Sequence, residues 1–189
     1  MRDSCHLPLI CHPATPAPMV SRIDVRAELL PGRHIKFHYC LRGDVARLRI
    51  PPEVPAQRAD RLWEHTCFEA FVGVREAEDY REFNFSPSGQ WATYGFAGYR
   101  RPTQESPTIP APDMTVRATP GRLELAAVVP AIALPTSPVE TWLIGLCAVV
   151  EAVDTVTHAH SYWALRHPSA RPDFHHREGF ILNVSDLLA

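Results

Sequence analysis

LWEHTCFEAFVGV (residues 62–74) and YREFNFSPSGQWATYGFAGYR (residues 80–100) are the two runs of the sequence that decide the fold. Successive side chains of a β-strand point to opposite faces, so a strand with one buried face alternates between apolar and polar residues. The apolar face of the first run holds Phe68, Ala70 and Val72. Its opposite face holds His65, Cys67, Glu69 and, as an apolar exception, Phe71. We therefore expect a strand that packs on the core with one face only.

The second run repeats this pattern and adds a turn. Along it, Arg81, Phe83 and Phe85 alternate with Tyr80, Glu82 and Asn84. Residues 86–89, Ser-Pro-Ser-Gly, have the composition of a turn, and residues 91–96 follow as a third strand. If the strands of the two runs pair, one face of the sheet is an aromatic core and the other gathers two carboxylates, an imidazole and an amide.

The composition indicates one domain without a nucleic-acid or membrane partner. A chain of 189 residues buries enough surface for a single core, and its net charge of −2 provides no basic field for nucleic acid or an anionic membrane. The N-terminal residues lack the long apolar run of a signal peptide or membrane anchor. The cysteines are odd in number and widely spaced, which is typical of reduced thiols. These features predict a cytoplasmic protein.

The remaining segments predict further short strands. Prolines at positions 8, 13, 16 and 18 make residues 1–20 a poorly ordered lead-in, and residues 21–189 form the domain. Alternating patterns predict additional strands at residues 21–30, 34–41, 45–50, 114–118, 122–129, 141–150, 156–165 and 179–184. About ten strands without βαβ alternation predict an all-β fold, an antiparallel β-sandwich of jelly-roll type.

Glu69 and Glu82 are the first candidates for chemistry. They should lie on one face of adjacent strands, where directly opposed neighbours are about 5 Å apart. At that distance two carboxyl groups could serve as the acid and the nucleophile of a glycoside hydrolase. Glutamates on a solvated sheet, neutralised by nearby arginines, have the same spacing. Binding is therefore preferred to catalysis, with the hydrolase as the alternative.

The tryptophans and histidines are the other candidates. Trp63, Trp91 and Trp163 occur beside polar residues, and sugar sites use aromatic rings against C–H groups with polar side chains on the hydroxyls. Indoles that close the ends of the core would occupy the same positions. The histidines that could join in a zinc site are His65, His158, His160, His167, His175 and His176. Haem would need an axial His or Met, and no CxxCH is present. Solvated or hydrogen-bonded histidines are the default interpretation, so we expect no cofactor and no metal.

Three segments together carry a family resemblance: RADRLWEHTCFEAFVG, YREFNFSPSGQWATYGFAGYR and SYWALRHPSARPDFHH. They resemble the DOMON-like, type 9 carbohydrate-binding-module-like (CBM9-like) bacterial proteins, from about residue 21 to the C-terminus and most specifically at EFNFSPSGQWATY. The resemblance implies a β-sandwich that receives a ligand on the polar face or edge of a sheet. Type 9 modules bind sugars between aromatic rings, and other DOMON domains hold haem or sugar.

The residues and the resemblance together predict a non-catalytic binding domain. Its expected partner is a small carbohydrate or glycoconjugate, with a haem-binding domain as a further alternative. No oligomeric state is predicted. The predicted ligand-binding residues are His65, Glu69, Glu82, Asn84, Trp91 and Trp163.

Overall fold

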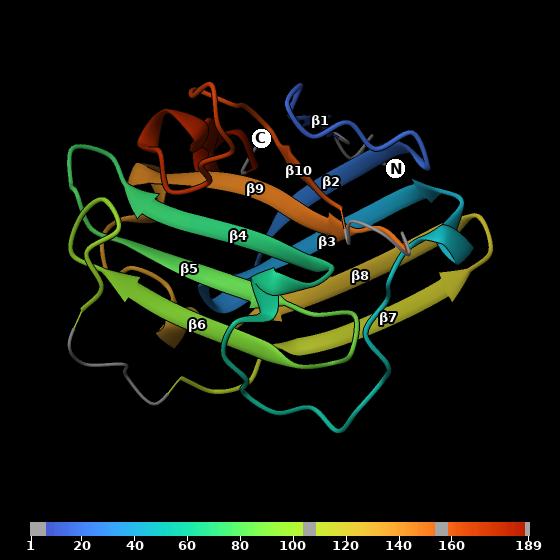
Figure 1. Ribbon diagram of the computed structural model, residues 1–189. Coiled ribbons are helices and arrows are strands. Elements are labelled where there is room, and N and C mark those ends of the chain that lie inside the picture. The colour runs from blue at the N-terminus through green and yellow to red at the C-terminus, as the bar shows by residue number, and fades with distance from the viewer. Residues whose placement is uncertain (1–6, 104–108, 154–158, 188–189) are drawn as a thin grey trace.

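The strands form two antiparallel layers joined along one side (Figure 1). The computed structural model describes residues 7–103, 109–153 and 159–187. The front sheet has the order β6 (Trp91–Phe96), β5 (Tyr80–Phe85), β4 (Cys67–Val74), β9 (Trp142–Glu151) and β10 (His160–Ala164), with β11 (Leu182–Asn183) also paired to β9. The back sheet has the order β1 (Leu7–Cys11), β2 (Val20–Leu30), β3 (His34–Gly43), β8 (Arg122–Val129) and β7 (Asp113–Thr119). The predicted all-β antiparallel sandwich is confirmed.

Short 3-10 turns are the helical elements of the described residues. They are η1 (Pro31–Arg33), η2 (Val45–Arg47), η3 (Leu62–Glu64), η4 (Ala131–Ala133), η5 (Val139–Thr141), η6 (Arg177–Gly179) and η7 (Val184–Leu187). Within this part of the chain no helix has the length and apolar character needed to cross a membrane.

The core lies between the two sheets and is built by the alternation seen in the sequence. Phe68 of β4 packs against Tyr39 of β3, with ring centroids 5.0 Å apart, and Phe85 of β5 packs against Phe37 at 6.2 Å. All four rings are fully buried. Burial of each such side chain contributes about 1.5–3 kcal/mol, so the apolar faces of β4 and β5 bind the front sheet to the back sheet. Their polar faces are consequently directed away from the core.

The loop between β5 and β6 fixes the register of the front sheet. Gly89 donates its backbone N–H to the Ser86 carbonyl at 3.0 Å, which closes the predicted turn, and its φ of +91° favours glycine. Phe85 then pairs with Trp91 across the loop, and Glu82 pairs with Tyr94. Directly paired residues point to the same face of a sheet. Trp91 therefore shares the core-directed face of Phe85, and Tyr94 shares the outer face of Glu82.

The first strand differs from the expected lead-in. Residues 1–20 were predicted to lack regular structure because of their prolines, but β1 pairs with both β2 and β10. Pro8 fits because the two pairings are divided: Leu7, Pro8 and Leu9 pair only with β2, and Ile10 and Cys11 pair only with β10. The missing N–H of proline is thus not needed on the second side. By this division β1 joins the two sheets.

Residues 45–50 are also not the predicted strand. The segment begins with the 3-10 turn η2, in which Arg47 and Leu48 donate backbone N–H groups to the carbonyls of Asp44 and Val45 at 3.0 and 3.1 Å. Its buried residues, Val45 and Leu48, are three apart, which matches the three residues per turn of a 3-10 helix. The apolar residues of this segment therefore follow the three-residue period of a 3-10 turn, and the predicted strand period of two is wrong. The strands expected at 156–165 and 179–184 are the shorter β10 and β11, and residues 154–158 lie outside the described ranges.

Candidate functional site

A pocket of about 470 Å³ lies on the outer face of the front sheet. Its floor comes from strands β4, β5, β6, β9 and β10, and its walls come from η3, the loop after β6 and the segment between β10 and η6. The lining residues are Trp63, Glu69, Glu82, Tyr94, Phe96, Arg100, Pro102, Val149, Tyr162, Pro172, Phe174 and His175. Aromatic rings and two carboxyl groups thus dominate the lining.

Glu69 is a buried carboxyl group in the floor of this pocket. Its side chain is 3% exposed, and its Oε1 has no hydrogen-bond partner. The other oxygen, Oε2, has only a weak contact of 3.9 Å from the Cys147 thiol. Burial, and next the neighbouring charge of Glu82, raise the pKa of Glu69 well above its ordinary value. An unsatisfied buried oxygen costs about 1–3 kcal/mol, so this atom is suited to a ligand or a water molecule.

Glu82 and Asn84 belong to β5 and lie beside Glu69 of the neighbouring strand β4. Asn84 is fully buried and donates its side-chain N–H to Glu82 Oε1 at 2.6 Å. Burial raises the pKa of Glu82 to about 7, while the Asn84 hydrogen bond and then the Arg100 charge act in the opposite direction. Glu82 can consequently change its protonation state near neutral pH.

A hydrogen-bonded network holds His175 over this pair. The Tyr80 hydroxyl accepts the backbone N–H of Arg100 at 3.1 Å and lies 2.9 Å from His175 Nδ1. We assign the hydroxyl proton to this second contact, so Nδ1 accepts and Nε2 carries the imidazole hydrogen. Burial, and next Arg100, lower the pKa of His175 to about 4, so the ring is neutral at pH 7. Its Nε2 lies 3.7 Å from Glu82 Oε2.

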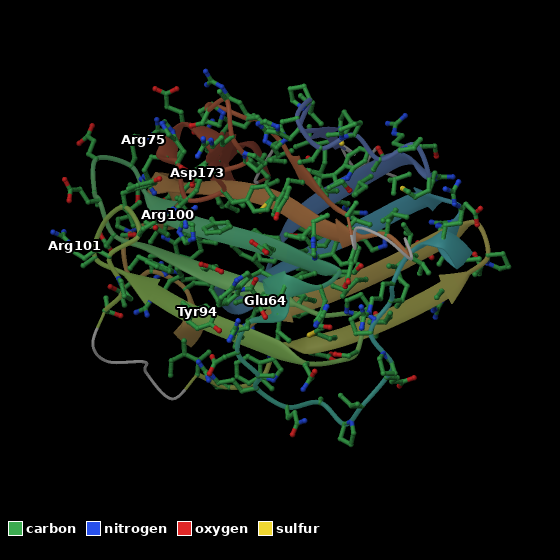
Figure 2. All side chains as sticks on the ribbon, in the orientation of Figure 1. Glu64, Arg75, Tyr94, Arg100, Arg101 and Asp173 are labelled. Atoms are coloured by element: carbon green, nitrogen blue, oxygen red, sulfur yellow. The ribbon has the colours of Figure 1, made fainter. Side chains whose placement is uncertain are left out.

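An ion pair closes one end of the pocket. Arg100, in the loop after β6, lies 3.0 Å from Asp173 in the C-terminal segment, and Tyr99 donates its hydroxyl to the same carboxylate at 2.7 Å. Figure 2 shows Arg100 and Asp173 close together at one end of the front sheet, with Tyr94 and Glu64 nearer its middle. Hydrogen bonds to Tyr99 and Arg100 lower the pKa of Asp173 against its burial, which keeps the carboxylate ionised.

Trp63 and Tyr94 form the aromatic edge at the other end. Their ring centroids are 5.7 Å apart in an edge-to-face arrangement, and the Trp63 side chain is 40% exposed. Both line the pocket. An exposed indole beside a phenol can cover an apolar ligand face without first being freed from the core.

The structure brings together three of the six predicted site residues. Glu69, Glu82 and Asn84 lie on the outer face of β4 and β5, with Asn84 beneath the lining and in contact with Glu82. His65 lies outside the lining, at the end of η3, where its Nδ1 is 2.8 Å from Glu151 Oε2. That contact links His65 to the end of β9.

The other two predicted residues, Trp91 and Trp163, lie away from the pocket. Trp91 pairs with Phe85, and Trp163 belongs to the main core cluster, where its indole N–H donates to the Ser161 hydroxyl at 3.0 Å. Both rings are under 10% exposed. The tryptophan of the pocket is Trp63, which was one of the three candidate tryptophans but was not among the six predicted ligand-binding residues.

Several lining residues were not among the six predicted ligand-binding residues. Tyr94 and Phe96 could have been found from the loop length, because pairing residue 85 with 91 also pairs Glu82 with Tyr94. Arg100, Phe174 and His175 lie in the segments that carry the resemblance, and His175 was considered only as a metal ligand; their place in the pocket had no local signal, because loops distant in the chain carry them there.

The residues present do not fit haem or a metal centre. His175 is the imidazole in the lining, but its Nδ1 lies 2.9 Å from the Tyr80 hydroxyl, and an iron bound at its Nε2 would lie against the Glu82 carboxyl group 3.7 Å away. Among the described residues no group of three or more His, Cys, Asp or Glu side chains is arranged to hold a metal ion, and His158 lies outside those residues.

The comparisons with known proteins support the fold. No family model matches the sequence, and no curated protein matches it. Among solved structures, a proposed carbohydrate-binding protein from Bacteroides uniformis ATCC 8492 is similar, with a TM-score of 0.67 and 20% sequence identity. The match covers 94% of this chain and 84% of the other. At this identity the likeness establishes a shared β-sandwich architecture.

Proposed function

We propose that this protein is a non-catalytic β-sandwich that binds a small carbohydrate or glycoconjugate in the pocket of the front sheet. The observation that carries the proposal is the pairing of an aromatic lining with a buried, unpartnered carboxyl oxygen, Glu69 Oε1. Sugars present an apolar C–H face and a ring of hydroxyl groups. Aromatic faces cover the first, and carboxyl, amide and imidazole groups fix the second.

Two further points support this proposal. The pocket has an open volume of about 470 Å³, within the range of small-molecule sites. The similar solved structure is itself a proposed carbohydrate-binding protein, and the sequence motifs resemble DOMON-like and CBM9-like domains. The proposal includes no nucleic-acid or membrane partner, because the chain has a net charge of −2. A cytoplasmic location stays a prediction.

Binding is better supported than hydrolysis. A retaining glycosidase needs one protonated and one ionised carboxyl group, which different surroundings keep apart in pKa. Here burial is the main cause of a raised pKa for both Glu69 and Glu82. The two groups differ in their hydrogen bonds, because only Glu82 accepts from Asn84, but neither forms an ion pair with a described arginine or lysine that would hold it ionised as a nucleophile.

Isothermal titration against a panel of mono- and disaccharides tests the function. We expect at least one sugar to release or absorb heat, with affinity reduced about tenfold or more by Phe96→Ala and by Glu82→Gln. Glu28→Gln, on the back sheet, and Ile132→Ala, a 76% exposed apolar residue, are the matched controls. An absence of heat across the panel, or affinity unchanged in both pocket variants, would refute the proposal.

A further inference from the structure

The cations near the pocket already have anionic partners. Arg100 is the only Arg or Lys among the lining residues of the described chain, and Asp173 lies 3.0 Å from it. Arg58 stacks over the Tyr94 ring at 5.6 Å and pairs with Asp60 at 2.9 Å. Neither guanidinium contacts the two floor carboxyl groups within salt-bridge distance. The unmatched ionisable groups of the pocket are thus acidic.

Glu69 and Glu82 each have one oxygen with free capacity. Glu69 Oε1 is buried and has no partner. Glu82 uses Oε1 to accept from Asn84, whereas its Oε2 is 3.7 Å from the nearest imidazole nitrogen, beyond hydrogen-bond distance. Two acceptor oxygens on neighbouring strands therefore need donors from a ligand. An ammonium group has three N–H donors and a positive charge, which satisfies both oxygens and compensates both carboxylates.

The aromatic lining is compatible with the same group. The faces of Trp and Tyr rings attract cations, and an ammonium within about 6 Å of a ring centroid gains further stabilisation. The same rings cover the C–H face of a sugar. The aromatic lining residues are Trp63, Tyr94, Phe96, Tyr162 and Phe174.

Building on the carbohydrate-binding function proposed above, we infer that the pocket selects an amino sugar, whose protonated amine donates to Glu69 and Glu82 while the rings cover the sugar face. A neutral hexose supplies hydroxyl donors but no positive charge that would favour ionisation of the two glutamates. An N-acetylated hexosamine loses the positive charge and adds a group that the floor must accommodate. The free amine should therefore bind more tightly than either.

Amine binding should displace protons from the floor. Burial raises the pKa of both glutamates in the free protein, and an adjacent ammonium favours their ionised forms. Among the groups facing them, the thiols and phenols have raised pKa values, His175 has a lowered one, and Arg100 stays charged. Glu69 and Glu82 are consequently the groups of the pocket from which an adjacent ammonium would displace protons. The facing groups are Tyr39, Cys67, Tyr80, Tyr94, Arg100, Cys147, Tyr162 and His175.

The test is isothermal titration at pH 7 with matched hexoses. The ligands are glucose, glucosamine and N-acetylglucosamine, followed by the galactose and mannose series. We expect one free amine to bind at least tenfold more tightly than its parent and its acetylated form. In Glu69→Gln and in Glu82→Gln, checked for folding by circular dichroism, this advantage should fall below about threefold.

A second measurement needs no variant. Titrations of the wild type in phosphate and in HEPES should give different apparent enthalpies for the amine, because the released protons are taken up by buffers with different heats of ionisation. Equal enthalpies, or a neutral hexose that binds as tightly as its amine, overturn the amino-sugar inference and leave the carbohydrate proposal standing. Binding of putrescine without binding of any sugar overturns the carbohydrate proposal, and no binding by the whole series and the wider panel overturns both.

Discussion

Glu69 and Glu82 occupy the same face of neighbouring strands but are not opposite each other. Glu69 pairs with Asn84, and Glu82 pairs with Phe71. The two glutamates are therefore diagonal neighbours, which typically places their Cα atoms about 7–8 Å apart. Asn84 lies directly opposite Glu69, yet it donates its side-chain N–H to Glu82, two residues away on its own strand, and Glu69 has no equivalent donor. The difference in hydrogen bonding makes Glu69 Oε1 the open position of the floor.

The raised pKa of Glu82 should appear in the pH dependence of stability. A carboxyl whose pKa rises from 4.5 to about 7 on folding stabilises the protein below pH 4.5, and this contribution is lost as the pH rises through 7. The free energy of unfolding of Glu82→Gln minus that of the wild type should therefore increase by about 2 kcal/mol from pH 5 to pH 8. Urea denaturation at both pH values measures the change. A constant difference between the two proteins would contradict the buried environment of Glu82, and Glu28→Gln should show no such gain.

Removal of the Asn84 amide should destabilise the protein through Glu82. Asn84→Ala leaves Glu82 Oε1 without its donor, and an unsatisfied buried acceptor costs about 1–3 kcal/mol. In a double-mutant cycle with Glu82→Met, which removes the acceptor oxygen, urea denaturation should give a coupling energy of at least about 0.5 kcal/mol. Strictly additive effects would show that the 2.6 Å hydrogen bond does not link the two residues.

Gly73 should control the segment that carries Phe174 and His175. A Cβ at Gly73 would lie 1.6 Å from Arg177 Nη1, and Arg177 donates to the backbone carbonyls of Val74 and Ala77 at 2.7 and 3.2 Å. Gly73→Ala must displace this guanidinium and release the segment from the end of β4. We expect faster amide hydrogen exchange across residues 171–180 and weaker ligand binding.

Gly121→Ala is the matched control for that change. Apart from the adjacent residues of the chain, no atom lies within 4 Å of a Cβ at Gly121, so this variant should leave hydrogen exchange and binding unchanged. If Gly73→Ala behaved like Gly121→Ala, the anchoring role of Arg177 would be wrong.

The tryptophans should separate into a binding and a structural class. Trp63→Ala removes a ring that is 40% exposed at the pocket edge, so affinity should fall about tenfold with little change in stability. Trp163→Ala removes a core ring and should lower the free energy of unfolding by about 3–5 kcal/mol. Titration and urea denaturation of the two variants measure both quantities. A loss of affinity in Trp163→Ala with none in Trp63→Ala would contradict the assignment of the binding site to the pocket.

The sequence predicted the layers better than it predicted the pocket. Alternation along β4 and β5 placed Phe68 in the core and Glu69 outside it, because strand periodicity is a local property. The position of Trp91 needed the β5–β6 register, which depends on the length of the turn. Arg100 and His175 could not be predicted, because their approach to Glu82 depends on loops that meet only in the folded chain. Pro8 argued against a strand at the start of the chain, but β1 forms because its first residues pair with β2 and its last residues pair with β10.

The most direct test of the account is a crystal structure of the protein with the sugar that binds it in titration. We expect the sugar ring to contact Trp63 or Tyr94 and to place a donor within hydrogen-bond distance of Glu69 Oε1. A saturating sugar bound elsewhere on the molecule, with the Glu69 pocket free of it, would contradict the central claim.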